Sequence, residues 1–215
     1  MTLSNLFVAS VKRKGIDTAE TSGNGRGYSL TVTKRYLPLR VKDGEIGKGV
    51  RFVYSFALMD LTKRMHVGYP VSVKSERDTY YRAMDMIRKM NIDLKSVRLD
   101  KYHSGENILE DFIENTIIFI IPKKNSRIRG RSKWRDFIRR FMDDPMNYLR
   151  EYFKMNASES GFSSDKRKTG GLIYQRRNDR KETSEFCKGL IHNLMSLHSW
   201  QLGGLCPTAP AENRL

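Results

Sequence analysis

The pattern of apolar and polar positions in the first third of the chain is that of β-strands. Residues 28–36 are β-branched and aromatic and alternate with polar positions, which predicts a strand. Two further runs, 51–61 and 65–73, are separated by a short polar step and predict a hairpin. A turn-rich stretch, 41–49, precedes this hairpin. Near the N-terminus, residues 5–11 fit either a strand or a short helix.

Glycine recurs in residues 15–27, where Gly23, Gly25 and Gly27 occupy alternate positions. A glycine-rich loop that opens a helix can cradle a nucleotide phosphate. This run lacks the Rossmann spacing, however, and no helical pattern follows it. We therefore expect a flexible turn between strands.

The hydrophobic period then changes from two to about 3.6 residues. Residues 77–91 carry apolar side chains at three- and four-residue steps, which predicts an amphipathic helix. A short apolar strand follows and ends at Asp100, and a second helix is expected from there to Asn115. The apolar run 116–121 predicts another strand. Later helices are expected at 145–153 and 182–198.

This order of elements predicts an α/β fold with a mixed sheet. The hairpin strands come first, and a helix then connects each later strand to the one before it. Because helical crossovers join parallel strands, the later strands should run parallel, with helices packed on the faces of the sheet. The C-terminal part should be basic and largely helical.

Composition narrows the class of partner. The 215 residues include 40 lysines and arginines against 24 acids, a formal net charge of +16. Such a surface attracts polyanions such as DNA, RNA or anionic membranes. No apolar run approaches the roughly 18 residues of a membrane span, and the N-terminus lacks the pattern of a signal peptide. With only two cysteines, Cys187 and Cys206, a disulfide framework is not expected, and we predict a reducing, cytoplasmic location.

These cysteines do not form a zinc motif with the nearby histidines. Cys187, His192, His198 and Cys206 are irregularly spaced, and two of them lie on one apolar helix. We interpret them as a core cysteine and capping or surface histidines.

Basic residues are concentrated in 123–140, where nine lysines and arginines face one acid, Asp136. Trp134, Phe137 and Phe141 are interleaved with them. One interpretation is a solvated face beside a small apolar cluster. We favour a segment that follows a phosphate backbone, with aromatic rings available to stack on bases.

Three acids stand out by position: Asp17 before the glycine run, Asp100 at the end of a strand, and Glu159 beyond the sheet. Enzymes that cut or join phosphodiesters use such carboxylates to hold two divalent ions about 3.5–4 Å apart. Asp60 is the alternative to Asp17, although the residues after it are typical of a hairpin turn. The alternatives to Glu159 are Asp165, Glu182 and Glu185.

The sequence resembles the catalytic domain of DDE transposases encoded by insertion sequences. The likeness covers roughly residues 10–198. It is carried by the segments around Asp17 (Gly-Ile-Asp-Thr-Ala-Glu-Thr-Ser-Gly), Asp100 (Val-Arg-Leu-Asp-Lys-Tyr-His-Ser) and Glu159 (Glu-Ser-Gly-Phe-Ser-Ser-Asp-Lys-Arg). The segment 174–180 and the step His192-Asn193-Leu194 add to it.

The resemblance implies a ribonuclease H-like fold and a DDE triad of Asp17, Asp100 and Glu159. These residues would hold two Mg²⁺ or Mn²⁺ ions for cleavage of DNA and strand transfer. The implied partners are transposon ends and target DNA, with no membrane, and a homodimer is compatible with the family. The basic residues expected to contact DNA are Lys123, Lys124, Arg127, Arg129, Arg131, Lys133, Lys166, Arg167, Arg176, Arg177 and Arg180.

We expect one catalytic domain over residues 1–198, with a basic, partly helical insertion at about 123–155 and a disordered tail at 199–215. The chain departs from the family in one respect. Such transposases usually carry an N-terminal DNA-binding region, whereas 16 residues precede Asp17 here. We therefore expect a truncated gene product, or recognition of the ends by another component. The alternative function is a non-catalytic nucleic-acid-binding protein or an inactive transposase remnant.

Overall fold

A mixed sheet lies at the centre of the protein. The computed structural model describes residues 2–30 and 52–201. Within these ranges the strands are β1 (Thr18–Leu30), β2 (Phe52–Asp60), β3 (His66–Gly68), β4 (Val71–Ser72), β5 (Asp93–Leu99), β6 (Ile117–Phe119) and β7 (Leu172–Ile173). Their order is β3-β2-β1-β5-β6, with β4 paired to β2 and β7 to β1. Strand β2 is antiparallel to β3 and β4, which confirms the hairpin predicted from 51–61 and 65–73, and it is also antiparallel to β1. Strand β5 runs parallel to β1 and β6 parallel to β5, as predicted for the later strands.

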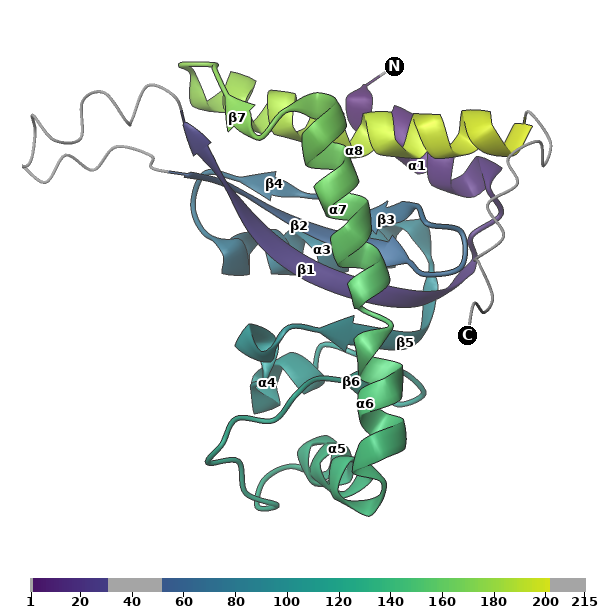
Figure 1. Cartoon of the computed structure of the whole chain (residues 1–215), viewed down its shortest axis with the longest axis vertical. Coiled ribbons are helices and arrows are strands. Elements are labelled where there is room, and N and C mark those ends of the chain that lie inside the picture. Colours follow the sequence, from purple (N-terminus) through teal and green to yellow (C-terminus); the bar gives the residue numbers. More distant parts are fainter. Residues whose placement is uncertain (1, 31–51, 202–215) are drawn as a thin grey trace, which may run out of the picture.

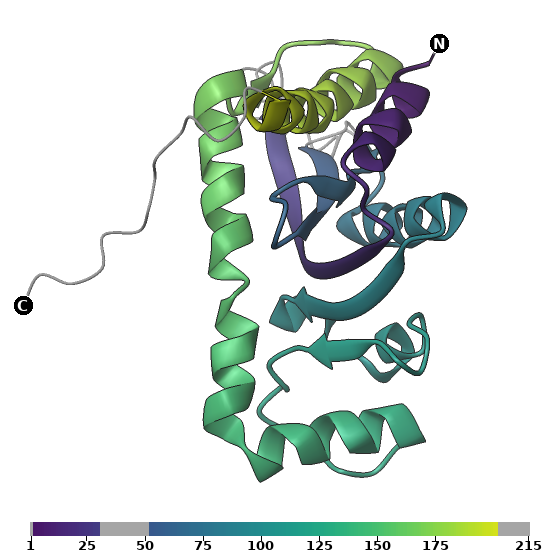
Figure 2. The same cartoon turned by 90° about the vertical axis from the view of Figure 1, so that its right-hand side faces the viewer.

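Helices surround this sheet on several sides. They are α1 (Leu3–Arg13), α3 (Glu76–Met90), α4 (Glu106–Leu109), α5 (Ser132–Asp143), α6 (Pro145–Phe153), α7 (Asn156–Thr169) and α8 (Asn178–Gln201), with a short 3₁₀ turn at Lys101–His103. Figure 2 shows α6 and α7 stacked in a column along one side of the sheet, with α3 on the other side. Helices α8 and α1 lie across the end of the sheet formed by β3 and β4 (Figure 1). No helix in the described ranges is long and apolar enough to cross a bilayer.

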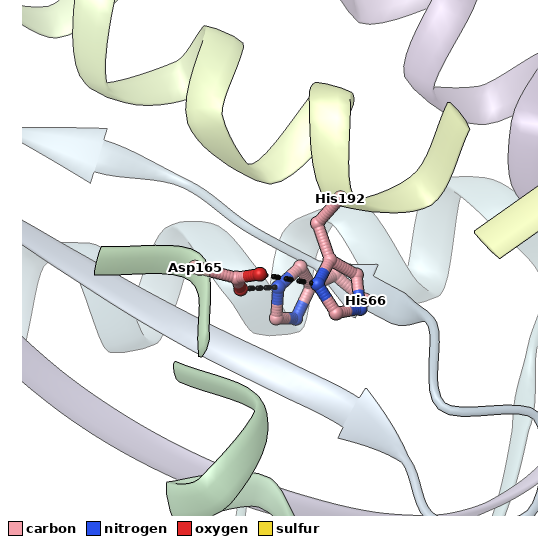
Figure 3. A group of neighbouring side chains, drawn as sticks. All are labelled: His66, Asp165 and His192. Atoms are coloured by element: carbon pink, nitrogen blue, oxygen red, sulfur yellow. Dashed lines mark hydrogen bonds and ion pairs between the residues drawn. The ribbon is translucent and has the colours of Figure 1, made fainter. Parts of the chain in front are cut away.

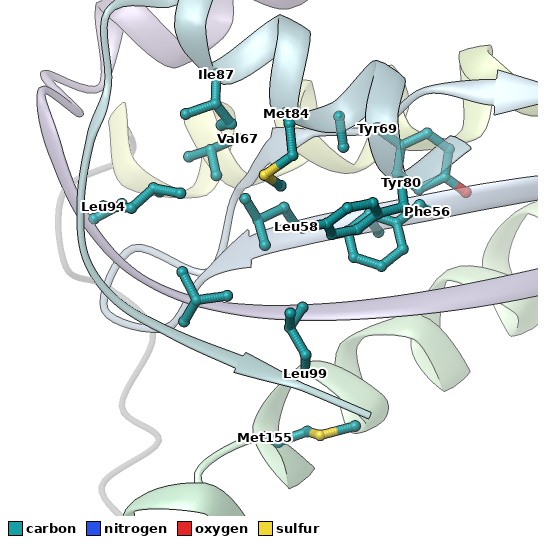
Figure 4. Close-up of a cluster of buried hydrophobic side chains, with 14 of the residues drawn as sticks. Phe56, Leu58, Val67, Tyr69, Tyr80, Met84, Ile87, Leu94, Leu99 and Met155 are labelled. Carbon is teal, nitrogen blue, oxygen red and sulfur yellow. The ribbon is translucent and has the colours of Figure 1, made fainter. Parts of the chain in front are cut away.

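Helix α3 forms the main apolar layer. Ser75 caps its first turn through a hydrogen bond to the Asp78 amide, and Asn91 ends it in the left-handed conformation. Its buried face packs on the sheet (Figure 4). The largest contributors to this layer are Tyr80, Met84, Ile87, Phe56, Leu58, Val67 and Leu99. The predicted amphipathic helix at 77–91 is therefore confirmed.

Helices α1 and α8 pack on each other, and the rings of Phe7 and Phe186 lie 5.6 Å apart. The buried amide of Asn193 in α8 joins this pair to the sheet. It accepts a hydrogen bond from the His66 backbone N–H and donates to the His66 carbonyl, each at 2.8 Å. Residues 5–11 are thus part of a helix, which settles the alternative that the sequence left open.

The prediction of a flexible turn at 15–27 is wrong, because the glycines lie inside strand β1. A Cβ on Gly23 would lie 2.6 Å from the Phe56 ring and 2.7 Å from Leu99. These glycines let α3 and its apolar layer approach the backbone closely, which is a known use of glycine in strands.

Other differences concern lengths and burial. The helix expected up to Asn115 is only the short α4, and residues 156–169, which the sequence left unassigned, form α7. Helix α8 continues to Gln201, beyond the predicted start of the tail; residues 31–36, 41–49 and 202–215 lie outside the described ranges. Trp134 packs on Phe137, Phe137 packs on Tyr148, and both Trp134 and Phe137 are buried, so the expected stacking of these two rings on bases is wrong.

The contact at Gly23 makes a prediction about stability. Gly23→Ala should lower the free energy of unfolding by about 1–3 kcal/mol, because the new methyl group overlaps Phe56 and Leu99. The matched control is Gly27→Ala on the same strand, where a Cβ would meet Phe52 at an ordinary 3.5 Å. Urea unfolding of both variants measures the difference. Equal stability of the two variants would contradict this account of the glycine run.

Candidate functional site

Asp100 lies at the carboxyl end of β5, the position that the sequence predicted. It is exposed, and its carbonyl oxygen accepts a hydrogen bond from the His103 amide at the start of the following turn. Burial raises the pKa of the nearby Tyr152 phenol, and the carboxylates of Asp100 and Glu159 raise it further. Asp100 on the sheet and Glu159 on α7 therefore act electrostatically on one buried ring.

A third carboxylate, Glu76, approaches Asp100 from the first turn of α3. Burial raises the pKa of Glu76, and the charge of Asp100 raises it further. A Cβ on Gly25 would overlap the Glu76 carboxyl group, so glycine is what admits this side chain. The sequence analysis missed Glu76. An acid in the first turn of a helix is an ordinary partner of the helix dipole and carries no distinct signal.

Strand β1 contributes an amide rather than an acid beside Asp100. The last parallel pair of β1 and β5 is Gly23 with Leu99, so Asn24 is level with Asp100. Side chains alternate along a strand, and Gly23 and Gly25 face α3, which places Asn24 on the opposite face. Arg26 shares that face: burial lowers its pKa, and Glu159 of α7 is among the charges that oppose this shift.

The structure does not bring Asp17 together with Asp100. The Asp17 carbonyl accepts a hydrogen bond from the amide of Asp93, the first residue of β5, whereas Asp100 follows the last. Because β1 and β5 are parallel, about 20 Å of strand separates the two acids. Asp17 instead shares a hollow with Glu20 and Asp60 at the end of the sheet where β1 and β5 begin.

Asp60, the alternative to Asp17, has a structural role at that same end. Its carboxylate accepts a hydrogen bond from the Lys63 amide at 2.5 Å, which closes the turn between β2 and β3. Burial raises its pKa, and the hydrogen bond from Lys63 opposes that rise.

The alternatives to Glu159 are each engaged elsewhere. Glu185 is fully buried, accepts a hydrogen bond from the Tyr69 hydroxyl at 2.7 Å and pairs with Lys188 at 3.2 Å. Glu182 accepts from the Val73 amide at 3.1 Å. Asp165 contacts two histidines. Glu159 differs because its side chain is exposed, on the helix that faces Asn24 and Arg26.

A buried arginine fixes the helix column next to this site. Arg98 of β5 is 1% exposed, and its guanidinium donates to the carbonyl and the carboxylate of Glu151 in α6, each at 2.9 Å. It also donates to the Ser96 hydroxyl at 2.7 Å and lies over the Phe119 ring. Since Tyr152 follows Glu151, this contact holds the phenol near Asp100.

The predicted DNA-binding residues occupy two regions. Lys123, Lys124, Arg127, Arg129 and Arg131 are exposed on the segment between β6 and α5, whereas Lys133 there is half-buried. Lys123 borders a hollow of about 340 Å³ formed largely by the turn after Asp100. The other group, near α7 and the start of α8, consists of Lys166, Arg167, Arg176, Arg177 and Arg180. Two of these have local partners: Lys166 lies over the Tyr28 ring and Arg177 pairs with Asp179.

Comparison with known proteins shows what the sequence of this chain is similar to. The chain is 40% identical over 197 residues to a probable transposase for insertion sequence element ISA1214 from Archaeoglobus fulgidus. The predicted resemblance to insertion-sequence transposases is confirmed. The match covers 92% of this chain and 59% of the relative, so the chain spans about three-fifths of the length of that transposase. No family model and no solved structure matches the chain.

The contact between Arg98 and Glu151 leads to a prediction about the stability of this chain. Glu151→Ala should lower the free energy of unfolding by about 3 kcal/mol, because a buried guanidinium loses its carboxylate. The matched control is Lys154→Ala, which removes the half-exposed partner of the same carboxylate and should cost under about 1 kcal/mol. Chemical denaturation at pH 7 measures both; similar losses would contradict a buried brace.

The pH dependence of the Glu151 contact has a definite sign. The hydrogen bond from Lys154, followed by that from Arg98, lowers the pKa of Glu151 below 4.5 despite partial burial. Its stabilising effect is therefore present above pH 4.5 and is lost as the pH falls through the lower pKa of the folded state. Glu151→Ala should accordingly lose less stability than the parent on acidification through that range.

Proposed function

We propose that the chain is the catalytic part of an insertion-sequence transposase that cuts and joins DNA with divalent metal ions. The observation that carries the proposal is Asp100 at the carboxyl end of β5, with Glu76 and Glu159 reaching its surroundings from two helices, in a chain 40% identical to a probable transposase. Glu76 replaces Asp17 in the proposed site.

The topology supports a ribonuclease H-like fold for this domain. Three antiparallel strands are followed by a helix and then by two strands parallel to the first, in the order β3-β2-β1-β5-β6. In open α/β sheets, ligands bind outside the carboxyl ends of the parallel strands. Asp100 occupies that place next to the central strand β1.

The donor set fits hard divalent cations. Asp100 and Glu159 offer carboxylate oxygens, and Asn24, on the face of β1 toward α7, offers a neutral amide oxygen, all ligand types that Mg²⁺ and Mn²⁺ accept. Glu76 approaches Asp100 from the α3 face of the sheet. Burial raises the pKa of Glu76 and repulsion from the Asp100 charge raises it further; a bound cation would relieve that repulsion. When bound, such ions would activate the attacking oxygen and stabilise the leaving oxygen of a phosphodiester.

The protein's own groups would place the DNA. Lys123 at the hollow beside the Asp100 turn and the exposed basic residues that follow it would hold the phosphate backbone. Burial and the carboxylates of Asp100 and Glu159 raise the pKa of Tyr152, so its phenol stays neutral and can donate a hydrogen bond without adding negative charge. The predicted homodimer stays a prediction.

One observation favours the second candidate, an inactive remnant that still binds DNA. Strand β1 carries Asn24 level with Asp100, and Asp17, the acid predicted from the sequence, lies at the far end of the sheet. An amide is a weaker ligand for a hard cation than a carboxylate, so the metal site of this copy would be less strongly negative.

Metal-dependent nicking of plasmid DNA tests the site. The purified chain should nick supercoiled DNA with Mg²⁺ or Mn²⁺, and Asp100→Ala and Glu159→Gln should each reduce the rate at least 100-fold, while Glu76→Gln reduces it about tenfold or more. The control is Asp17→Asn, which should keep the parental rate because that side chain lies about 20 Å of strand away.

Each outcome assigns the site differently. If the single variants Asp17→Asn and Asp100→Ala both lose nicking, the triad predicted from the sequence is restored and the role of Glu76 is rejected. Absence of nicking by the parent, with DNA binding intact, would favour the remnant.

Salt dependence tests the DNA-binding surface separately. Affinity for duplex DNA should fall linearly on a log–log plot against salt, because bound lysines and arginines release counterions. The triple variant Lys123→Ala, Lys124→Ala, Arg127→Ala should weaken binding and reduce the slope by about 3. Arg88→Ala with Lys89→Ala, exposed on α3, is the control of similar charge. A slope near zero for the parent, or equal slopes for both variants, would contradict this surface.

A further inference from the structure

A second cluster of metal-ligating side chains lies away from Asp100. His66 on β3, Asp165 on α7 and His192 on α8 each place one ligand atom within 4.8 Å of the others (Figure 3). The cluster is built into the fold, since His66 is fully buried, Asp165 is 8% exposed and His192 is largely covered. No local sequence motif predicts this cluster, because its members come from three segments far apart in the chain.

The hydrogen bonds of the cluster call for a positive charge between its members. Nε2 of His192 lies 2.8 Å from the carbonyl oxygen of Arg64, which can only accept, so Nε2 carries a hydrogen. In a neutral imidazole, Nδ1 is then a lone pair, yet it faces Oδ1 of Asp165 at 2.7 Å. Two acceptors at that distance require a proton between them or a metal ion that binds both from one side.

The surroundings match those of a ligand histidine. Metal-binding imidazoles usually donate their second N–H to a carbonyl or carboxylate, which fixes the tautomer and the ring. His192 does this through Arg64. His66 is held through its backbone by the amide of Asn193, and its Nε2 lies 3.3 Å from the second oxygen of Asp165. One carboxylate oxygen of Asp165 thus faces His66, and the other faces His192.

We propose that His66, Asp165 and His192 form a zinc site that fastens β3, α7 and α8 together. Two imidazole nitrogens and one carboxylate oxygen are a donor set for Zn²⁺ or a similar transition ion, with a fourth position left for water. Mg²⁺ prefers oxygen ligands alone, so this site differs in chemistry from the acids around Asp100.

The place of the cluster shows which elements an ion there would join. Asp165 follows Glu159 by six residues on α7, about 9 Å along the helix axis. A metal ion at Asp165 would join α7 to the β3 edge of the sheet and to α8, and would fix the helix that carries Glu159.

Metal titration of the whole chain tests the proposal without any activity assay. After treatment with a chelator, the protein should bind one Co²⁺ per chain with the visible absorption of a four-coordinate site, and Zn²⁺ should displace it. Zinc at about 100 times its dissociation constant should raise Tm by roughly 5–10 °C. Mg²⁺ at the same concentration should leave both signals unchanged.

Two variants and one control locate the ion. Asp165→Asn keeps the shape of the side chain and His192→Gln changes the least buried ligand, and both should lose the Co²⁺ absorption and the Tm shift. His198→Ala, an exposed histidine on the same helix, should keep them. No zinc-dependent shift in the parent would overturn the proposal and leave a protonated His192 paired with Asp165. An equal loss in His198→Ala would also overturn it.

Discussion

A charge buried on strand β5 determines how helix α6 packs against the sheet. The guanidinium of Arg98 is removed from water, so its N–H groups need acceptors inside the protein. Strand β5 supplies the Ser96 hydroxyl, Glu151 of α6 supplies a carbonyl and a carboxylate, and the carboxylate of Glu20 on β1 lies 3.9 Å away. Helix α6 must therefore dock on β5, two residues before Asp100. The position of the helix column relative to the acid at the strand end follows from this one requirement.

The central strand β1 meets the opposite requirement, which is to present little side chain. Gly23 lets the apolar layer under α3 reach the backbone, and Gly25 leaves room for the Glu76 carboxyl group. The other face of the strand carries Asn24 and Arg26 toward α7. One strand thus has a bare face that admits α3 and a polar face that lines the candidate site. The glycines of this strand are held in it by β2, which pairs with residues 21–29, and Gly23 is also paired with β5.

Local patterns were sufficient for most of the fold. The hairpin, α3, the strand ending at Asp100 and the last helix all have periodicities that short windows detect. The place of Asp100 at the end of a strand could be predicted because strand, acid and turn are consecutive. The separation of Asp17 from Asp100 could not be predicted, because it depends on the parallel register of β1 and β5, which no local window contains. The approach of Glu76 to Asp100 could not be predicted for the related reason that it exists only after α3 packs on the sheet. The pairing of His66 with Asp165 spans 99 residues.

Helix α7 is where these constraints meet. Its sequence is rich in serine and lacks a continuous apolar stripe, so burial of apolar area gives it little preference for one position. Specific contacts hold it instead: Asp165 with two histidines, Lys166 over the ring of Tyr28, and Gly161 against Met59. Because an α-helix is stiff over 14 residues, whatever occupies the cluster at Asp165 also sets the place of Glu159. The geometry of the acids around Asp100 therefore depends on a polar cluster that touches none of them.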